Sequence, residues 1–278
     1  MIDRRTRLRR FAEIELPAAL LVCVALAPYA WMVLTSIKPT VEIARFPVVY
    51  LPDAPTLSHY ADLFARTTFP DNLLDSLLVA VSACALGLGL SVPAAYAFSR
   101  FGFAGRRFLM TQFLTINMFP IVLMIIPLFV AMRALGLLDT VLGVVLGHAT
   151  FAIPFAIWML TSYLNGIPRE LDEAAMVDGA TRLQTIVRIL LPLAAPGIAS
   201  TGIYIFVASW NEYLFAMMLS GQNVRTVTVA LQLFIGEYTI QWGLLTAGGT
   251  LVALPVTVLF LFVQRHLVGG LTAGAVKS

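Results

Sequence analysis

The chain contains few residues that could carry out acid–base, nucleophilic or metal chemistry. Its three histidines, His59, His148 and His266, lie far apart in the sequence, and its two cysteines, Cys23 and Cys84, lie within apolar runs. The sequence has no G-x-x-x-x-G-K-[ST] phosphate-binding loop, no H-E-x-x-H metal motif and no G-x-S-x-G nucleophile turn. We therefore predict no catalytic residues, no metal site and no cofactor held by this chain.

One short polar group interrupts the apolar stretch that precedes the last outer loop. Trp210, Asn211, Glu212 and Tyr213 follow one another there. A carboxylate in such a position is costly unless it faces a cavity, water or a partner group. Two interpretations stay open: Asn211 and a neighbour line a substrate pathway, or the polar pair joins helices, which polar residues in membrane bundles often do. Asn117, one turn before Pro120, is a weaker pathway candidate.

A polar segment of the chain, Glu170–Pro192, lies between two strongly apolar stretches and is typical of two short helices joined by a turn. Three acidic residues near its start suit a helix N-terminus, where the helix dipole favours negative charge. Gly179 can adopt the left-handed conformation that ends a helix. Thr181 and Gln184 have the spacing of a capping box for a second helix, Arg182–Leu190.

Composition places these segments in a membrane. Of the 278 residues, 59% are hydrophobic and 12% charged, and the mean hydropathy is +0.88. Soluble domains carry about 25% charged residues, so this chain cannot cover its own surface with polar groups. Apolar runs of about 20 residues, enough to cross a bilayer, recur along the chain. The sequence thus predicts an all-α polytopic membrane protein with six transmembrane helices: Leu16–Ile37, Asn72–Phe98, Phe108–Met132, Val141–Leu164, Pro196–Leu219 and Trp242–Val263.

The basic residues predict the orientation of these six helices, because cytoplasmic segments carry an excess of Lys and Arg. With both termini inside, thirteen of the 18 basic residues are cytoplasmic. The thirteen are Arg4, Arg5, Arg7, Arg9, Arg10, Arg100, Arg106, Arg107, Arg169, Arg182, Arg188, Arg265 and Lys277. The other five, Lys38, Arg45, Arg66, Arg133 and Arg225, are extracytoplasmic. The segment Glu170–Pro192 then faces the cytoplasm, and the proline-rich segment Lys38–Asp71 forms an ordered outer loop with one short helix, Leu57–Arg66.

The spacing within the cytoplasmic segment resembles the EAA loop of ABC importer permeases, the loop that docks on the ATPase subunits. The matching residues are Glu173, Ala174, Ala175, Gly179, Ile189, Leu191 and Pro192. The segments 94–100, 135–140 and 153–158 resemble the carbohydrate branch of the same family. The resemblance extends over roughly Leu16–Leu267 and is similar in layout to the smaller permease of maltose importers.

This resemblance implies a type I ABC importer permease fold in a bacterial inner membrane. The expected domains are residues 1–71 with the N-terminal tail, first helix and outer loop, residues 72–267 as the core permease domain, and residues 268–278 as a cytoplasmic tail. The implied partners are a second permease in a heterodimer, two ATPase subunits that bind ATP and Mg²⁺, an extracytoplasmic solute-binding protein, a sugar and membrane lipid, without nucleic acid. A disaccharide such as trehalose or maltose is the expected substrate.

A rival hypothesis is an ATP-independent channel or proton-coupled carrier. It would explain the six helices and the carboxylate of Glu212, but it would not explain the spacing of the EAA residues. Specificity in the importer family rests largely on the binding protein and on a cavity shared with the second permease, so the sequence does not name the sugar.

Overall fold

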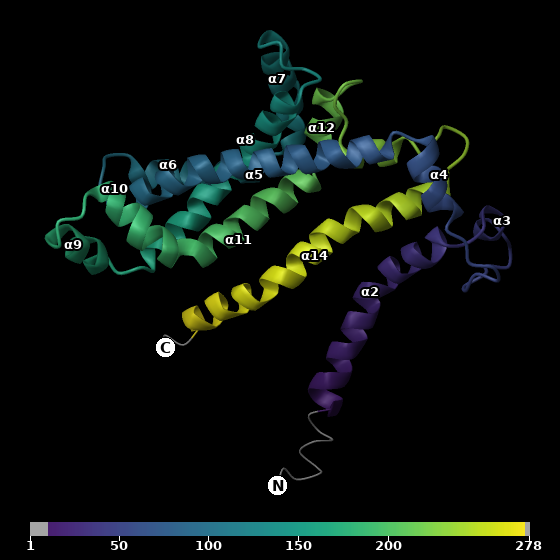
Figure 1. The fold of residues 1–278 in the computed structure, drawn as a ribbon, viewed down its shortest axis with the longest axis horizontal. Helices are drawn as coiled ribbons and strands as arrows, with labels where there is room; N and C mark the ends of the chain where they lie inside the picture. Colours follow the sequence, from purple (N-terminus) through teal and green to yellow (C-terminus); the bar gives the residue numbers. More distant parts are fainter. Residues whose placement is uncertain (1–10, 276–278) are drawn as a thin grey trace, which may run out of the picture. The chain divides into compact units, whose positions relative to one another are not determined.

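The computed structural model describes residues 11–275 and is helical through almost all of them (Figure 1). The residues divide into two compact units, which are residues 1–70 with 231–254 and residues 71–230 with 255–278. The predicted N-terminal tail, residues 1–10, and residues 276–278 lie outside the described residues.

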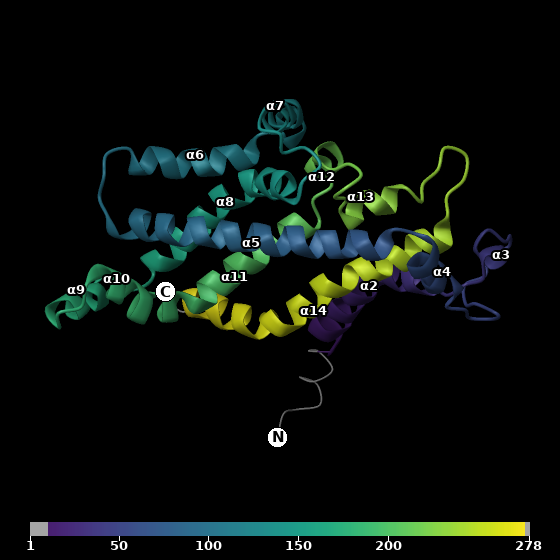
Figure 2. The ribbon, with the colours of Figure 1, turned by 45° about the horizontal axis from the view of Figure 1, so that its top comes forward.

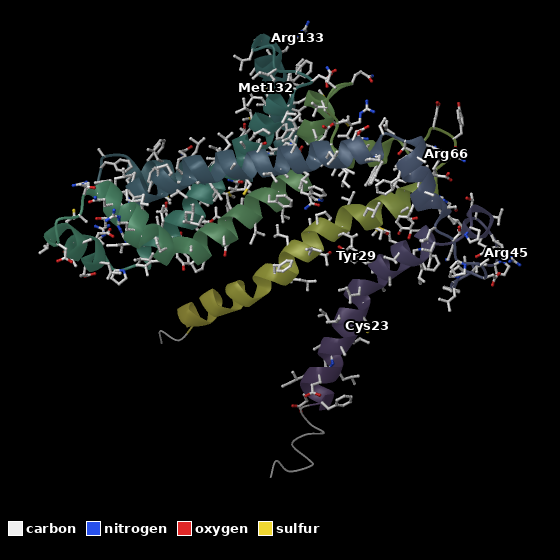
Figure 3. The ribbon with its side chains drawn as sticks, viewed as in Figure 1. Cys23, Tyr29, Arg45, Arg66, Met132 and Arg133 are labelled. Carbon is white, nitrogen blue, oxygen red and sulfur yellow. The ribbon has the colours of Figure 1, made fainter. Side chains whose placement is uncertain are left out.

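The first unit contains the first predicted membrane helix and the outer loop. Its elements are η1 (Phe11–Glu15), α2 (Leu16–Ser36), α3 (Thr40–Ile43), α4 (Ser58–Arg66) and the first part of α14 (Trp242–Ala275). The loop between α2 and α4 is ordered by Lys38, whose buried Nζ donates to the Val49 carbonyl at 2.6 Å and lies 4.0 Å from the ring centroid of Trp31. The helix α4 begins one residue after the predicted start, and Ser58 N–H donates to Thr56 Oγ1. Figure 3 labels Cys23 and Tyr29 on α2 and Arg45 in this loop.

The second unit contains the second to fifth predicted spans, the end of the sixth and the EAA-like segment. Its elements are α5 (Phe69–Arg100), α6 (Arg106–Met118), α7 (Ile121–Ala134), α8 (Val141–Asn165), α9 (Glu170–Val177), α10 (Arg182–Thr185), η2 (Ile186–Leu190), α11 (Leu191–Trp210), α12 (Leu214–Leu219), α13 (Val227–Gln232) and the later part of α14. The helix α8 lies at the centre, with twelve buried residues along its length. The helix α6 lies alongside α5, where the Phe98 and Phe113 ring centroids are 5.5 Å apart (Figure 2).

The third predicted span is not one straight helix. The helices α6 and α7 meet at Phe119–Pro120 with a bend of 101°, and α7 projects away from α5 and α6, with Met132 and Arg133 toward its far end (Figure 3). Pro120 has no N–H for the helical ladder and stands as the N-cap of α7. The six predicted spans therefore correspond to five continuous helices and this bent pair.

The fifth predicted span begins earlier and ends earlier than predicted. The chain is helical without interruption from Arg182 to Trp210, through the π-helical turn η2. The helix then stops at Asn211, and the short helix α12 begins at Leu214. A proline at position 192 is expected to end or kink the second helix of the segment. The helix does not end there, and a π-helical turn lies just before Pro192, whose missing N–H removes a backbone donor from the helical ladder.

Two apolar clusters hold the second unit together on either side of its middle. At one end, Phe215 and Leu219 of α12 pack with α7 and with Val144 of α8. At the other end, Leu160 and Leu164 of α8 pack with Leu190. The last helix, α14, runs on to Ala275, so most of the predicted C-terminal tail is helical.

Candidate functional site

The EAA-like segment forms the predicted pair of short helices at one end of the second unit (Figure 1). The first helix, α9, ends before Gly179, which has φ +87°, a backbone conformation that residues with a Cβ rarely adopt. The predicted capping box is present: Thr181 Oγ1 accepts from Gln184 N–H, and Gln184 Oε1 accepts from Thr181 N–H at 2.8 Å. Local sequence therefore fixes the shape of this segment, which we call the coupling hairpin (residues 170–190).

The two central alanines of the coupling hairpin differ in exposure. Ala175 is buried against the chain at 6% exposure, whereas Ala174 and Glu173 are exposed. Val177 is 88% exposed, and Met176 is exposed as well. The hairpin thus presents small and apolar side chains together with the exposed carboxylates of Glu170, Glu173 and Asp178.

The remaining motif residues lie where the hairpin joins the membrane helices. Ile189 and Leu191 are partly buried, and Pro192 is exposed. Between Ile189 and Leu191, Leu190 is 1% exposed and packs with α8. The exposed residues of the motif are therefore Glu173, Ala174, Gly179 and Pro192.

A second polar site lies where α11 gives way to α12. Glu212 accepts hydrogen bonds from the N–H groups of Phe215 and Ala216 at 3.0 and 2.9 Å, and so caps the first turn of α12. Its other contact is His148 of α8, whose Nε2 lies 3.1 Å from Glu212 Oε2. The second ring nitrogen of His148 is 2.7 Å from Ser209 Oγ of α11.

Only part of this contact set can be predicted from the sequence. A histidine in an apolar span, such as His148, indicates a hydrogen bond between helices. Its partners, Ser209 and Glu212, are far away in the sequence and could not be identified from it. Because the His148 side chain is 1% exposed, the group pins the broken end of α11 to the centre of α8.

The four other pathway candidates divide into exposed and enclosed residues. Asn211 is exposed, and among the described residues its side chain bonds only to Val207 of its own helix, at 2.9 Å. Asn117 is likewise exposed and bonds to Phe113 of α6. Trp210 is 2% exposed, and Tyr213 is partly buried. The two exposed amides therefore lie beside the two breaks, one before the α6–α7 bend and one at the end of α11.

At the end of the second unit opposite the hairpin, Asp139 binds the loop 221–225. The sequence alone does not single out this residue. Its carboxylate accepts hydrogen bonds from the N–H groups of Gln222, Asn223 and Val224 at 3.0–3.1 Å. Slight desolvation acts to raise the pKa of Asp139, but these backbone donors and that of Gly221 outweigh it and lower the pKa. Its own positive φ of 57°, a conformation that Asp tolerates better than most residues, lets the turn present the carboxylate to this loop.

Comparison with known proteins identifies the family. Residues 87–272 match the family described as the binding-protein-dependent transport system inner membrane component. The chain belongs to this family. Its members are non-catalytic membrane permease subunits, so the chain is a permease subunit and not an enzyme.

Named relatives resemble the chain over nearly its whole length. It is 36% identical over 262 residues to the sulfoquinovosyl glycerol transport system permease protein SmoH of Agrobacterium fabrum, covering 94% of this chain and 92% of that protein. It is also 36% identical to the trehalose transport system permease protein SugB of Mycobacterium tuberculosis, covering 93% and 95%. A solved bacterial ABC transporter involved in the import of the acidic polysaccharide alginate superposes with a TM-score of 0.81 at 25% identity, over 95% of this chain and 98% of that chain. The all-α polytopic permease fold and the family expected from the sequence are thereby confirmed.

Proposed function

We propose that the chain is one permease subunit of an ATP-driven sugar importer in a bacterial inner membrane. It pairs with a second, related permease, forms half of the translocation pathway and rests on two ATPase subunits, while an extracytoplasmic binding protein delivers the sugar. The names of the relatives, which include trehalose and sulfoquinovosyl glycerol permeases, support a sugar substrate. A disaccharide such as trehalose or maltose remains our proposal within that class.

The observation that carries this proposal is the surface of the coupling hairpin. Val177 is 88% exposed on a short helix that carries an exposed carboxylate, Glu173, beside an exposed small residue, Ala174. Leu171 and Met176 of the same short helix are exposed as well, and several exposed apolar side chains on one polar segment support a protein partner. Together with the family membership, this supports docking of the hairpin on an ATPase subunit.

The contacts within the second unit support the proposed orientation. The hairpin lies beside the basic turn after α5, where the Arg182 guanidinium is 5.2 Å from the ring centroid of Phe101. The turn around Asp139 and the loop 221–225 meet at the other end. Within the second unit, the hairpin and the basic turn proposed to be cytoplasmic therefore lie at the end opposite to the turn 135–140 and the loop 221–225, which are proposed to lie outside.

Exposed amides at broken helices support the pathway proposal. Membrane transporters place substrate sites at discontinuous helices, where backbone groups are freed from the helical ladder. Asn211 and Asn117 are exposed at such breaks. We propose that they line the sugar pathway. We also propose that Glu212 stabilises the break between α11 and α12 through its bonds to the first turn of α12 and its contact with His148.

The experiment that tests the coupling role uses the whole importer, purified through a tag on this chain. Ala174→Trp adds bulk on the exposed face, and Gly179→Val forbids the positive φ of the turn. We expect both variants to insert in the membrane and to lose sugar uptake together with the co-purifying ATPase. Met217→Trp, an exposed residue on α12 at a distance from the hairpin, serves as the control. Normal uptake and ATPase retention in Ala174→Trp and Gly179→Val would contradict the proposal.

The rival of an ATP-independent channel or carrier gains no support from these findings. Relatives of the chain include the inner membrane ABC transporter permease protein YcjP of Escherichia coli, at 38% identity over 94% of this chain. The contacts of Glu212 with His148 and with the α12 backbone give this carboxylate a structural task that needs no coupled proton.

A further inference from the structure

The last residue of α5, Arg100, joins three helices at the base of the coupling hairpin. Its side chain is only 6% exposed. Nε donates to Asp172 Oδ2 of α9 at 2.6 Å, Nη1 to the Leu164 carbonyl of α8 at 3.1 Å, and Nη2 to the Ile167 carbonyl at 3.2 Å. One guanidinium therefore connects the end of α5, the end of α8 and the first turn of α9.

The partner of Arg100 is enclosed as well. The Asp172 side chain is 9% exposed, and its Oδ1 makes no hydrogen bond among the described residues. Removing both charges from water is costly, and such buried pairs are a poor way to gain stability. What the pair provides is geometry, because the planar guanidinium fork holds its acceptors at fixed directions, which a lysine ammonium cannot do.

A second arginine also connects α9 to the end of α5. Arg169, directly before α9, donates from Nη2 to the carbonyl of Ser99 at 2.7 Å. The end of α5 thus holds α9 through Arg100, and the start of α9 holds α5 through Arg169. Because both bonds join the end of α5 to the start of α9, movement of α9 away from α5 would break at least one of them.

We propose that Arg100, through Asp172, is the positioning residue that passes movement of the coupling hairpin to the membrane helices α5 and α8. This inference rests on the proposed function, in which the ATPase moves the hairpin. Docking itself uses the exposed face of α9. Asp172 lies on the enclosed face of α9, where it contacts Arg100 of α5. Loss of the pair should therefore leave the ATPase bound but separate ATP hydrolysis from transport.

The test compares Arg100→Lys and Asp172→Asn in the importer purified through a tag on this chain. Arg100→Lys keeps the charge but cannot bond Asp172 and both carbonyls together, and Asp172→Asn keeps the shape while it removes the charge. Arg107→Lys, at an exposed arginine in the first turn of α6, is the matched control. The measured quantities are ATPase co-purification, thermal stability, ATP hydrolysis and sugar uptake.

We expect ATPase subunits to co-purify normally with both variants and uptake per ATP hydrolysed to fall, by about 2- to 30-fold, the range for loss of one member of a coupling network. The Arg107→Lys control should keep the wild-type ratio. A residue that only stabilises the fold would lower thermal stability and the amount of complex without changing that ratio.

Three outcomes overturn the inference. An unchanged ratio in both variants shows that the pair transmits nothing, and a loss of the ATPase on purification shows that the pair serves docking. A loss of thermal stability in step with uptake, at a constant ratio, shows a structural role alone. The proposed function is tested separately by Ala174→Trp: if that variant abolishes uptake while Arg100→Lys leaves the ratio unchanged, only the present inference fails.

Discussion

The break between α11 and α12 allows a sharp separation of pathway residues from structural ones. Asn211 is exposed, and in the part of the chain that the structure describes its side chain bonds only within its own helix, so Asn211→Ala should change the free energy of unfolding by no more than about 0.5 kcal/mol. Glu212 differs, because its carboxylate caps α12 through two backbone donors and contacts His148.

The magnitude for Glu212→Ala follows from these contacts. Loss of a helix cap costs about 0.5–2 kcal/mol, and a buried polar group left without its partner, here His148, costs about 1–3 kcal/mol. Glu212→Gln keeps one acceptor oxygen for the cap and a hydrogen-bonding group for the histidine, so its cost should be about 1 kcal/mol. The expected order of stability is therefore wild type and Asn211→Ala, then Glu212→Gln, then Glu212→Ala.

Two assays on the purified importer check this order. Thermal unfolding of the complex should rank the variants as stated, and sugar uptake should fall in Asn211→Ala while ATP hydrolysis stimulated by the binding protein persists. Our reasoning is refuted if Asn211→Ala transports normally and Glu212→Ala is as stable as the wild type. If Asn211→Ala instead loses stability, the amide joins helices and does not line the pathway.

Three further predictions concern the ends of the second unit and its packing. Because the pKa of Asp139 is lowered, the contribution of its carboxylate to stability is present above the ordinary pKa of Asp and is lost as the pH falls through the lowered pKa. The thermal stability of Asp139→Asn should therefore be lower than that of the wild type at neutral pH, and it should change less when the pH is lowered. In a background without the two native cysteines, a cysteine at Gln222 should react in intact cells with a membrane-impermeant thiol reagent and one at Gly179 should not; reaction at Gly179 reverses the proposed orientation. A Cβ at Gly197 would lie 2.5 Å from Cγ of Tyr163, so Gly197→Ala should lower the thermal stability of the subunit, and an unchanged melting temperature would contradict this packing.

The local features of the fold could be predicted because neighbouring residues determine them. The capping box of Thr181 with Gln184 and the positive φ of Gly179 both follow from spacing of a few residues. The membrane helices follow from apolar length alone, since the hydropathy of a segment does not depend on its partners. For the same reason, hydropathy did not reveal the 101° bend at Phe119–Pro120.

The residues that organise the two sites could not be paired from one sequence. Arg100 and Asp172 are 72 positions apart, and nothing local indicates that they meet. Arg100 was counted only as a basic residue of a cytoplasmic turn, and Asp172 only as an acid in a first helical turn. Their roles depend on how α5, α8 and α9 converge, which is a property of tertiary packing.

The π-helical turn at Ile186–Leu190 has a consequence for the rotational phase between the coupling hairpin and α11. Such a turn takes one residue more than an α-helical turn, and one residue corresponds to about 100° around a helix axis. The face that continues from α10 into α11 is thus offset from the face that an uninterrupted 3.6-residue period would give. Deletion of one residue within this turn would restore the α-helical ladder and leave the hairpin facing nearly as it does now. Conversion of the turn to an α-helix without a deletion would instead rotate the hairpin by about 100° against the membrane helices, while every side chain in it stayed the same.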